Sequence, residues 1–337
     1  MAVPAHSNLG RRTLIAVVAA LALMASTMPT AGASPRRGGP RRSAAPAFVL
    51  ERGRFTSFEA KDPNVFLVPF GINNREQITG EYIRLDSESG LYRDPRGRVT
   101  SFDVPGAQGT EATDINESGQ IVGNYSEDTP IVNDATMNVH GFLRERSGKF
   151  TTIDAPGAVL TTAVGVNNRR QVVGFYTGRD GTSHGYLWEK GKFTKIDYPG
   201  GVVSQPVDVN DHGKILGAFS DSAGRIHGYL WSKGRFTTID YPDVAVTFPL
   251  EINNRDQIVG TAADDNMLTG ARGFLLAKGV KGPFTTITFP GAPRTQVTSI
   301  NDDGTIVGRY ENPNAQPNPQ RSGLQRAPDM TMTLPLH

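Results

Sequence analysis

The chain repeats one unit of about 43 residues six times between Phe48 and Tyr310. The clearest copy, HGYLWEKGKFTKIDYPGGVVSQPVDVNDHGKILGAF, runs from His184 to Phe219. One Asn recurs at the end of the third segment of every copy, at spacings of 43, 51, 43, 43 and 48 residues: Asn73, Asn116, Asn167, Asn210, Asn253 and Asn301. A repeat of this period predicts a fold that places copies of one supersecondary unit side by side.

Each unit contains four short runs rich in Thr, Val, Ile, Phe and Tyr, and Gly, Pro, Asn or Asp bounds each run. Such runs are typical of β-strands, and nothing in the repeats has the length or the 3.6-residue period of a helix. Four antiparallel strands in each of six units predict an all-β fold, a β-propeller of six four-stranded blades. A β-solenoid or a stacked sandwich is the alternative. The sequence leaves open whether six units close into a ring without the C-terminal tail.

A glycine also recurs inside the fourth segment of every unit: Gly80, Gly123, Gly174, Gly217, Gly260 and Gly308. Glycine weakens a strand unless a bulge or a close approach of backbone requires it. The recurring Asn opens the turn between the third and fourth segments, where its side chain can accept a hydrogen bond from the backbone two residues further on. Both positions predict structural roles.

The two ends of the chain do not share the repeat. Residues 1–33 have Arg11 and Arg12 before a short apolar run and end in a small-x-small sequence at Ala33, which predicts a secretory signal peptide. Residues 34–47 hold four Arg among Pro, Gly, Ser and Ala, which is typical of a disordered basic leader. Residues 48–310 form the propeller, and residues 311–337 are a tail rich in Pro and Asn. We therefore expect a secreted bacterial protein, exported by the Sec or the twin-arginine route.

Charge and cysteine content limit the classes of function. Six of the 35 basic residues and none of the 33 acidic residues precede residue 48, so the remainder carries a net charge of −4. A general nucleic-acid binder would be strongly basic throughout the domain. The chain has no Cys and no HExxH, P-loop or dinucleotide fingerprint, so we expect no metal and no cofactor. We also expect no membrane span after signal removal, and a monomer.

Two units, GFLRERSGKFTTIDAPGAVLTTAVGVNNRRQVVGFY and GYLWSKGRFTTIDYPDVAVTFPLEINNRDQIVG, resemble the bacterial extracellular repeats known as the HAF family, after a His-Ala-Phe signature. The resemblance covers residues 48–310, although the signature here reads His-Gly-Phe or His-Gly-Tyr, and units one, two and six lack the His. It implies export and a repeat fold, and it implies no settled activity.

The repeated His and Asp residues are the first candidates for chemistry. His140, His184 and His227 stand at one equivalent position in successive units, and Asp154, Asp197 and Asp240 end the second segment of the same units. In a central funnel, Asp154, Asp197, His184 and His227 would provide acid and base groups for a lyase, cyclase or hydrolase. The alternative is structural: the His bonds to a neighbouring carboxylate or backbone group, and the Asp caps the Pro-Gly bend. Gly181–Gly185 matches G-x-S-x-G by letter, but it lies in an expected β-to-β connection rather than before a helix, which indicates chance.

The loops predict two faces of different charge. Turns between the first and second segments carry Lys and Arg in all six units. Solvated turns are the simpler explanation, and an anion-recognising surface is the alternative. The opposite face collects the Asp series and loops that vary between units. Variable loops on a rigid scaffold are where function usually lies. We therefore predict a non-catalytic module that binds an extracellular or cell-envelope carbohydrate, peptide or protein through the acidic face. The predicted binding residues are Tyr198, Tyr241, Phe289, Asp154, Asp197 and Asp240. A purely structural envelope protein is a third interpretation.

Overall fold

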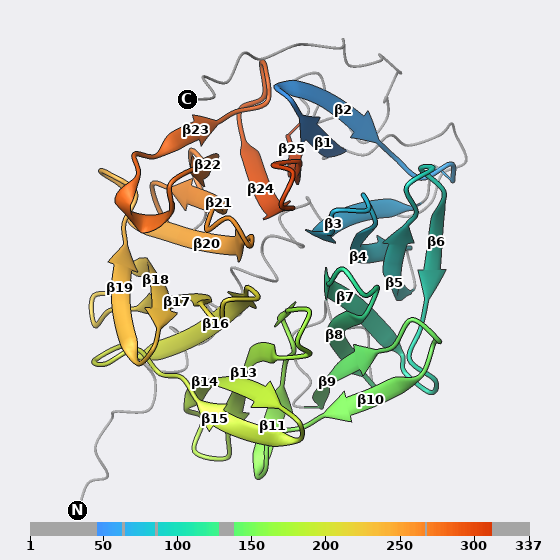
Figure 1. Cartoon of the computed structure of the whole chain (residues 1–337), viewed down its shortest axis with the longest axis vertical. Coiled ribbons are helices and arrows are strands. Elements are labelled where there is room, and N and C mark those ends of the chain that lie inside the picture. Colours follow the sequence, from blue (N-terminus) through green and yellow to red (C-terminus); the bar gives the residue numbers. More distant parts are fainter. Residues whose placement is uncertain (1–45, 63–64, 85–86, 128–137, 267, 312–337) are drawn as a thin grey trace, which may run out of the picture.

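The computed structural model describes residues 46–62, 65–84, 87–127, 138–266 and 268–311. Its strands form six antiparallel blades around a central axis, which confirms the predicted all-β propeller (Figure 1). With the innermost strand first, blade 1 contains β3 (Phe66–Ile72), β4 (Ile78–Ile83), β5 (Glu88–Arg93) and β6 (Val99–Phe102), and blade 2 contains β7 (Gly109–Ile115), β8 (Ile121–Ser126), β9 (Val139–Arg144) and β10 (Phe150–Ile153). In the same order, blade 3 contains β11 (Ala158–Thr161) with β12 (Gly165–Val166), then β13 (Val172–Gly178), β14 (Ser183–Glu189) and β15 (Lys192–Lys195), and blade 4 contains β16 (Val203–Val209), β17 (Ile215–Ser220), β18 (Ile226–Ser232) and β19 (Arg235–Ile239). Blade 5 contains β20 (Val246–Ile252), β21 (Ile258–Ala263), β22 (Arg272–Leu276) and β23 (Thr285–Ile287), and blade 6 contains β24 (Thr295–Ile300), β25 (Ile306–Tyr310), β1 (Ala47–Glu51) and β2 (Arg54–Phe58).

Blade 6 closes the ring with strands from both ends of the described chain. Strand β1 pairs antiparallel with β25, with Phe48 opposite Gly308, and the Tyr310 N–H donates to the Pro46 carbonyl at 3.3 Å. The sequence repeat is therefore out of phase with the blades. Its first two segments are the outer strands of one blade, and its last two are the inner strands of the next. Six units close within residues 46–311.

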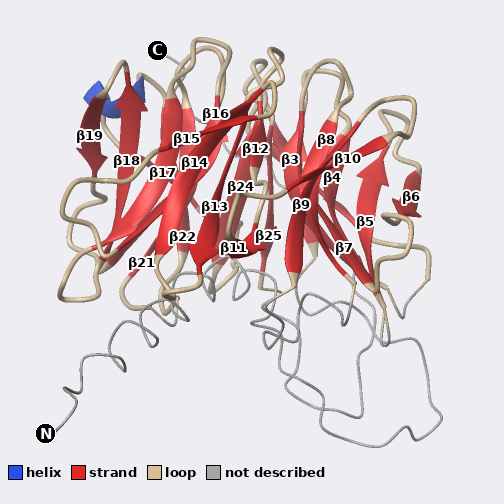
Figure 2. Ribbon diagram, turned by 90° about the horizontal axis from the view of Figure 1, so that it is seen from below, coloured by secondary structure: helices blue, strands red, loops and turns tan. Residues whose placement is uncertain are grey.

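The propeller has two faces, which Figure 2 shows at the two ends of the strands. We call turn face the one that carries the hairpin turns after the first and third strands of each blade. It lies uppermost in Figure 2, where the short 3-10 helix η2 (Gly279–Lys281) is drawn in blue. The opposite loop face carries the loops after the second strands and the loops that pass from one blade to the next. Because the cationic turns follow the third strands, they all lie on the turn face.

Both reasons predicted for the repeated glycine, a bulge and a close approach of backbone, are present in the structure. A Cβ built on Gly174 would overlap the carbonyl oxygen of Thr162 on the inner strand. In five blades the inner strand also shifts register beside the glycine, for example between Pro206 and Asp208 opposite Gly217. A bulge thus brings the inner backbone against the second strand, and only glycine leaves room for it.

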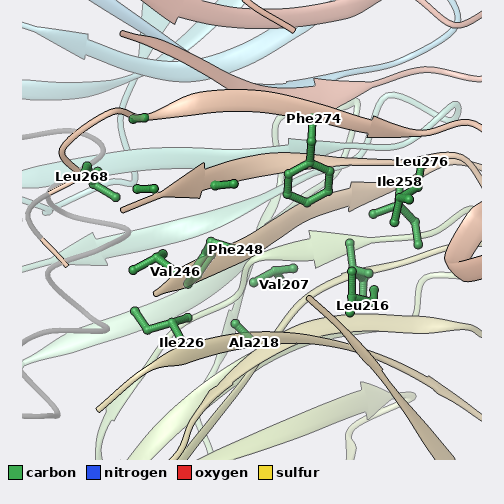
Figure 3. Packing of buried hydrophobic residues seen from close by; sticks show 14 of the residues in the cluster. Val207, Leu216, Ala218, Ile226, Val246, Phe248, Ile258, Leu268, Phe274 and Leu276 are labelled. Atoms are coloured by element: carbon green, nitrogen blue, oxygen red, sulfur yellow. The ribbon is translucent and has the colours of Figure 1, made fainter. Parts of the chain in front are cut away.

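The hydrophobic core lies in the seams between neighbouring blades. Figure 3 shows the seam of blades 4 and 5, where Leu216 and Ala218 of β17 face Phe248 of β20 and Phe274 of β22. All four side chains are fully buried. Burial of both faces of each blade explains why strands such as β17 contain adjacent apolar residues. It also fixes the loops of each blade relative to the next.

Candidate functional site

Three successive blades carry a His–Asp pair at one equivalent place on the loop face. Each pair joins the start of the third strand to the end of the fourth. The His Nδ1 atom lies within hydrogen-bonding distance of the carboxylate in all three: His140 and Asp154 at 2.9 Å, His184 and Asp197 at 2.9 Å, and His227 and Asp240 at 2.7 Å. The carboxylates stay partly open to solvent, with side-chain exposures of 48% for Asp154, 31% for Asp197 and 54% for Asp240.

An aromatic side chain of the second strand supports each imidazole. His227 lies opposite Phe219 in the β17–β18 register, and the two rings stack with centroids 5.0 Å apart. His140 stacks in the same way on Tyr125 at 5.1 Å. Directly opposite residues of an antiparallel pair are close enough for such contacts. The strand register and the Asp together therefore fix the orientation of each imidazole.

The candidate acid–base residues do not line the central funnel. Asp154, Asp197, His184 and His227 lie on or after the third and fourth strands, whereas the inner strands surround the axis (Figure 1). The alternative interpretation, in which they meet in the funnel, is wrong, because the His-Gly-Tyr segment of the repeat is the third strand from the axis. Each His bonds the Asp of its own blade, as the structural alternative proposed.

Further polar groups satisfy the pairs in blades 3 and 4. His227 Nε2 lies 3.3 Å from Asp221, so this imidazole stands between two carboxylates. Desolvation opposes ionisation of Asp221, but hydrogen bonds from the Arg225 N–H and from His227 lower its pKa to about 2. Asp197 also pairs with Lys195 at 2.9 Å. Asp197 and Asp221 thus each have a cationic partner, Lys195 and Arg225.

Thr182, His184 and Asp197 follow one another as hydroxyl, imidazole and carboxylate. Thr182 Oγ1 lies 3.0 Å from His184 Nε2, but also 2.6 Å from Asp180 Oδ1. A carboxylate only accepts hydrogen bonds, so the hydroxyl proton is directed to Asp180 and away from the imidazole. General-base activation needs that proton to face the base. Ser183, the central residue of the G-x-S-x-G match, is buried at the start of β14.

The three predicted aromatic binding residues pack across the seams. Tyr198 follows blade 3 and stacks on Phe219 of blade 4, with ring centroids 3.7 Å apart. The ring of Tyr241 packs against Phe274 of blade 5 with centroids 6.1 Å apart, and Phe289 stacks on Tyr310 of blade 6 with centroids 3.5 Å apart. Phe289, at 8% exposure, is a core residue. The loops that carry these rings fold toward the next blade, because an apolar ring beside a Pro bend is more stable in the seam than in water.

A hydroxyl of the next blade also fixes each of these loops, which sequence reasoning missed. The N–H after the Asp position donates to a buried Thr or Ser at the start of the next inner strand, at 2.8–3.1 Å. The pairs are Val104 with Thr110, Ala155 with Thr161, Tyr198 with Ser204, Tyr241 with Thr247 and Phe289 with Thr295. The sequence signal for this bond is a Thr or Ser six residues after the residue whose N–H donates. The hydrogen bond, rather than an Asp cap, holds the bend.

Two closed rings of hydrogen bonds surround the axis on the turn face. In the first, the Nδ2 of each repeated Asn donates to the carbonyl of the equivalent Asn in the next blade, at 2.9–3.2 Å, in the order Asn73, Asn116, Asn167, Asn210, Asn253, Asn301 and back to Asn73. The same side chains accept from the backbone, as predicted: Asn167 Oδ1 accepts from Arg169 N at 3.0 Å. The Asn series is therefore an inter-blade device as well as a turn former.

The second ring uses the next residue of each turn. Its side-chain oxygen accepts the N–H of the equivalent residue in the preceding blade, at 2.7–2.9 Å, in the order Asn74, Glu117, Asn168, Asp211, Asn254, Asp302 and back to Asn74. Amides and carboxylates alternate, so every carboxylate lies between two neutral neighbours. This spacing limits like-charge repulsion at the axis.

The alternation shows a two-blade period inside the sixfold ring. Turns of blades 1, 3 and 5 read Asn-Asn-Arg, whereas those of blades 2, 4 and 6 read Asn followed by Glu or Asp, with glycine two residues later. The side chains that lie next to these turns along the channel follow the same two-blade period. Asp114 and Asp208 accept backbone N–H groups of the next blade, from Val166 at 2.7 Å and from Ile252 at 2.8 Å.

The channel is a narrow polar passage rather than a substrate pocket. The cavity that these turns line has a volume of about 60 Å³, which has room for a few water molecules. Burial raises the pKa of Asp114 to about 6, and desolvation raises that of Glu111, deeper in the channel, to about 7. Burial and the nearby Asp114 also raise the pKa of Asp208. Ionisation of this layer at neutral pH therefore opposes folding.

We expect the domain to become more stable on mild acidification. The folded state holds more protons than the unfolded state between the ordinary values, 3.8 for Asp and 4.5 for Glu, and the raised pKa values of about 6 and about 7. Stability therefore falls as the pH rises through this window, by roughly 3 kcal/mol for one such group. Thermal melts at pH 5 and pH 7.5 test this, and a lower melting temperature at pH 5 would contradict it. Glu111→Gln keeps an acceptor for Asn124 and should weaken the dependence.

Within the described part of the chain, no group of three or more His, Asp or Glu is arranged to hold a metal ion. No helix among those residues has the length and apolar character needed to cross a membrane.

No family model matches the sequence, and no curated protein matches it either. Solved structures do match. A candidate TolB from Agrobacterium tumefaciens superimposes with a TM-score of 0.58 at 14% identity, over 81% of this chain and 99% of that one. The β-propeller domain of the trilobed protease from Pyrococcus furiosus gives 0.48 at 13% identity, over 81% and 90%. The Aleuria aurantia lectin gives 0.42 at 11% identity, over 75% and 97%. At these identities the likeness shows the β-propeller fold alone.

Proposed function

We propose that the protein is an exported, non-catalytic β-propeller that binds a carbohydrate, peptide or protein ligand through its loop face. The observation that carries the proposal is the recurrence of one exposed His–Asp pair at the same place in blades 2, 3 and 4. Export rests on the signal peptide predicted for residues 1–33, which lie outside the described residues. We also propose, on the repeat signature alone, that the chain belongs to the HAF repeats.

The pairs offer groups suited to a hydroxyl-rich ligand. Asp240 Oδ1 binds His227, and its other oxygen has no hydrogen bond to the described residues. A carboxylate oxygen fixed in this way accepts a hydrogen bond at low entropic cost, because the side chain is already ordered. Three equivalent groups on a rigid ring also favour a ligand with repeating units, since linked sites raise the apparent affinity. These points favour an oligosaccharide.

The geometry speaks against catalysis by the same residues. Each imidazole is held by its own Asp in a separate blade, and the channel has room only for a few water molecules. A general acid and a general base must reach one substrate together. The three pairs are arranged for contact along a surface instead.

The triple variant Asp154→Asn, Asp197→Asn, Asp240→Asn tests the proposal. We expect it to lose at least tenfold in affinity for uncharged glycans retained by the wild-type domain in a glycan and peptide panel. Its melting temperature should stay within a few degrees, because exposed ion pairs contribute little to stability. The matched control, Asp303→Asn, removes an exposed carboxylate of the turn face. Equal binding by the triple variant and the wild type would contradict the proposal.

A further inference from the structure

Three hairpins on the turn face place a cation in a backbone conformation that disfavours it. Strands β1 and β2, β14 and β15, and β18 and β19 are joined by two-residue turns, Arg52-Gly53, Lys190-Gly191 and Lys233-Gly234. Arg52, Lys190 and Lys233 have φ values of 49°, 52° and 50°. Two-residue turns with positive φ at both positions favour Asn-Gly or Asp-Gly. A long cationic side chain is therefore not required by the turn, which points to a role outside folding.

The cations of blades 3 and 4 are exposed and free of ion pairs with the described residues. They stand at equivalent positions in the two neighbouring blades, Lys190 and Lys192 in blade 3 and Lys233 and Arg235 in blade 4. In other blades, carboxylates form ion pairs with some of the equivalent turn-face cations, such as Asp94 with Arg98 at 3.3 Å. The loop-face Asp residues have partners of their own. Glu189 lies opposite Lys192 in the register and accepts from Gln171, so the rim of blades 3 and 4 carries four unpaired cations beside one carboxylate.

Two indoles accompany these cations. Trp188 and Trp231, the two Trp of the chain, stand two residues before Lys190 and Lys233. Both are half-buried and pack at the edges of the cores between blades 2 and 3 and between blades 3 and 4. They lie opposite Phe193 and Phe236 in the strand registers. Each turn thus combines cations with the accessible part of an indole, which suits a ligand that has both anionic groups and ring faces.

The centre of the turn face limits the shape of that ligand. Glu117, Asp211 and Asp302 surround the axis, inside the ring of cations. Arg75, Arg169 and Arg255 stand in the intervening turns, so the axis has charges of both signs and adds no one-sided attraction for a broad anionic surface such as a membrane. A narrow polymer can follow the rim and avoid the axis.

We propose that the turn-face rim of blades 3 and 4, formed by Lys190, Lys192, Lys233 and Arg235 with Trp188 and Trp231, binds a carboxylated polysaccharide. This surface is opposite the loop face and independent of the function proposed for it. The net charge of −4 over residues 48–337 gives no general affinity for polyanions, so binding depends on the rim.

The double variant Lys190→Asn, Lys233→Asn separates binding from folding. We expect at least a tenfold loss of affinity for polygalacturonate and a weaker salt dependence, measured by titration calorimetry at several ionic strengths. The melting temperature should equal or exceed that of the wild type, because Asn accepts the left-handed conformation better than Lys does.

A loop-face control has the same change in net charge. Lys61→Asn, Arg179→Asn removes two exposed cations from loops of the opposite face and should bind polygalacturonate like the wild type. Unchanged binding by the rim variant, or an equal loss in the control, would overturn the proposal. Retention of duplex DNA as strong as that of polygalacturonate would show a nucleic-acid surface and overturn the polysaccharide assignment.

Discussion

Deleting residues 46–58 is expected to abolish cooperative folding of the domain. The deletion removes β1 and β2, the outer half of blade 6, and exposes the edge of β25. It also removes Phe48, Leu50 and Phe55, which are at most 3% exposed. At roughly 2 kcal/mol for each buried side chain, the loss is about 6 kcal/mol, comparable with the whole stability of a domain. A thermal melt followed by circular dichroism measures the effect.

The matched control for this deletion is truncation after Glu311. The described chain ends there, with the Glu311 N–H donating to the Arg294 carbonyl at 3.0 Å. The truncated domain should melt within a few degrees of the full chain, because blade 6 is completed by the N-terminal strands. A cooperative melt of the deletion variant at the wild-type temperature would contradict the closure of the ring by β1 and β25.

The variant Gly174→Ala should destabilise the domain by about 3 kcal/mol. Its Cβ would overlap the Thr162 carbonyl oxygen, and neither backbone can move without breaking the pairing of β13 with its neighbours. Denaturant titration measures the change in the free energy of unfolding. Gly201→Ala is the control, since its Cβ would meet the nearest atom at 3.3 Å in a loop. A difference below 1 kcal/mol between the two variants would show that the repeated glycine is incidental.

The repeat predicted the fold because copies of one unit leave few ways to bury both faces of a strand. It could not predict which segment lies at the axis, since Gly, Pro, Asn and Asp mark every boundary between segments alike. The distance of His184 and His227 from the axis depends on which segment is the innermost strand. The sequence therefore left open whether these residues face the funnel, and they lie outside it.

The candidate site was predictable where contacts stay within a hairpin. His184 and Asp197 are thirteen residues apart and meet because β14 and β15 pair, and the structural alternative had named a carboxylate partner. Tyr198 was not predictable in this way, because its ring packs on a different blade, against Phe219. Contacts across a seam depend on where the next unit sits, which the letters of one unit do not contain.

One feature of the axis could have been read from the sequence alone. The turns alternate between Asn-Asn-Arg and Asn followed by an acid, as in Asn167-Asn168-Arg169 and Asn210-Asp211-His212. The Asn is the same in all six turns, and only the residue that follows it differs. That residue forms the second hydrogen-bonded ring, in which amides separate the carboxylates.

Hydrogen exchange of the domain with and without an uncharged glycan that it retains tests the proposed function most directly. We predict that the glycan slows exchange at the loop-face segments after β10, β15 and β19, residues 154–160, 197–202 and 240–245, beside the three His–Asp pairs. The turn-face segments 73–77 and 210–214 should exchange at unchanged rates. Protection confined to the turn face, with the loop face unaffected, would contradict a binding site on the loop face.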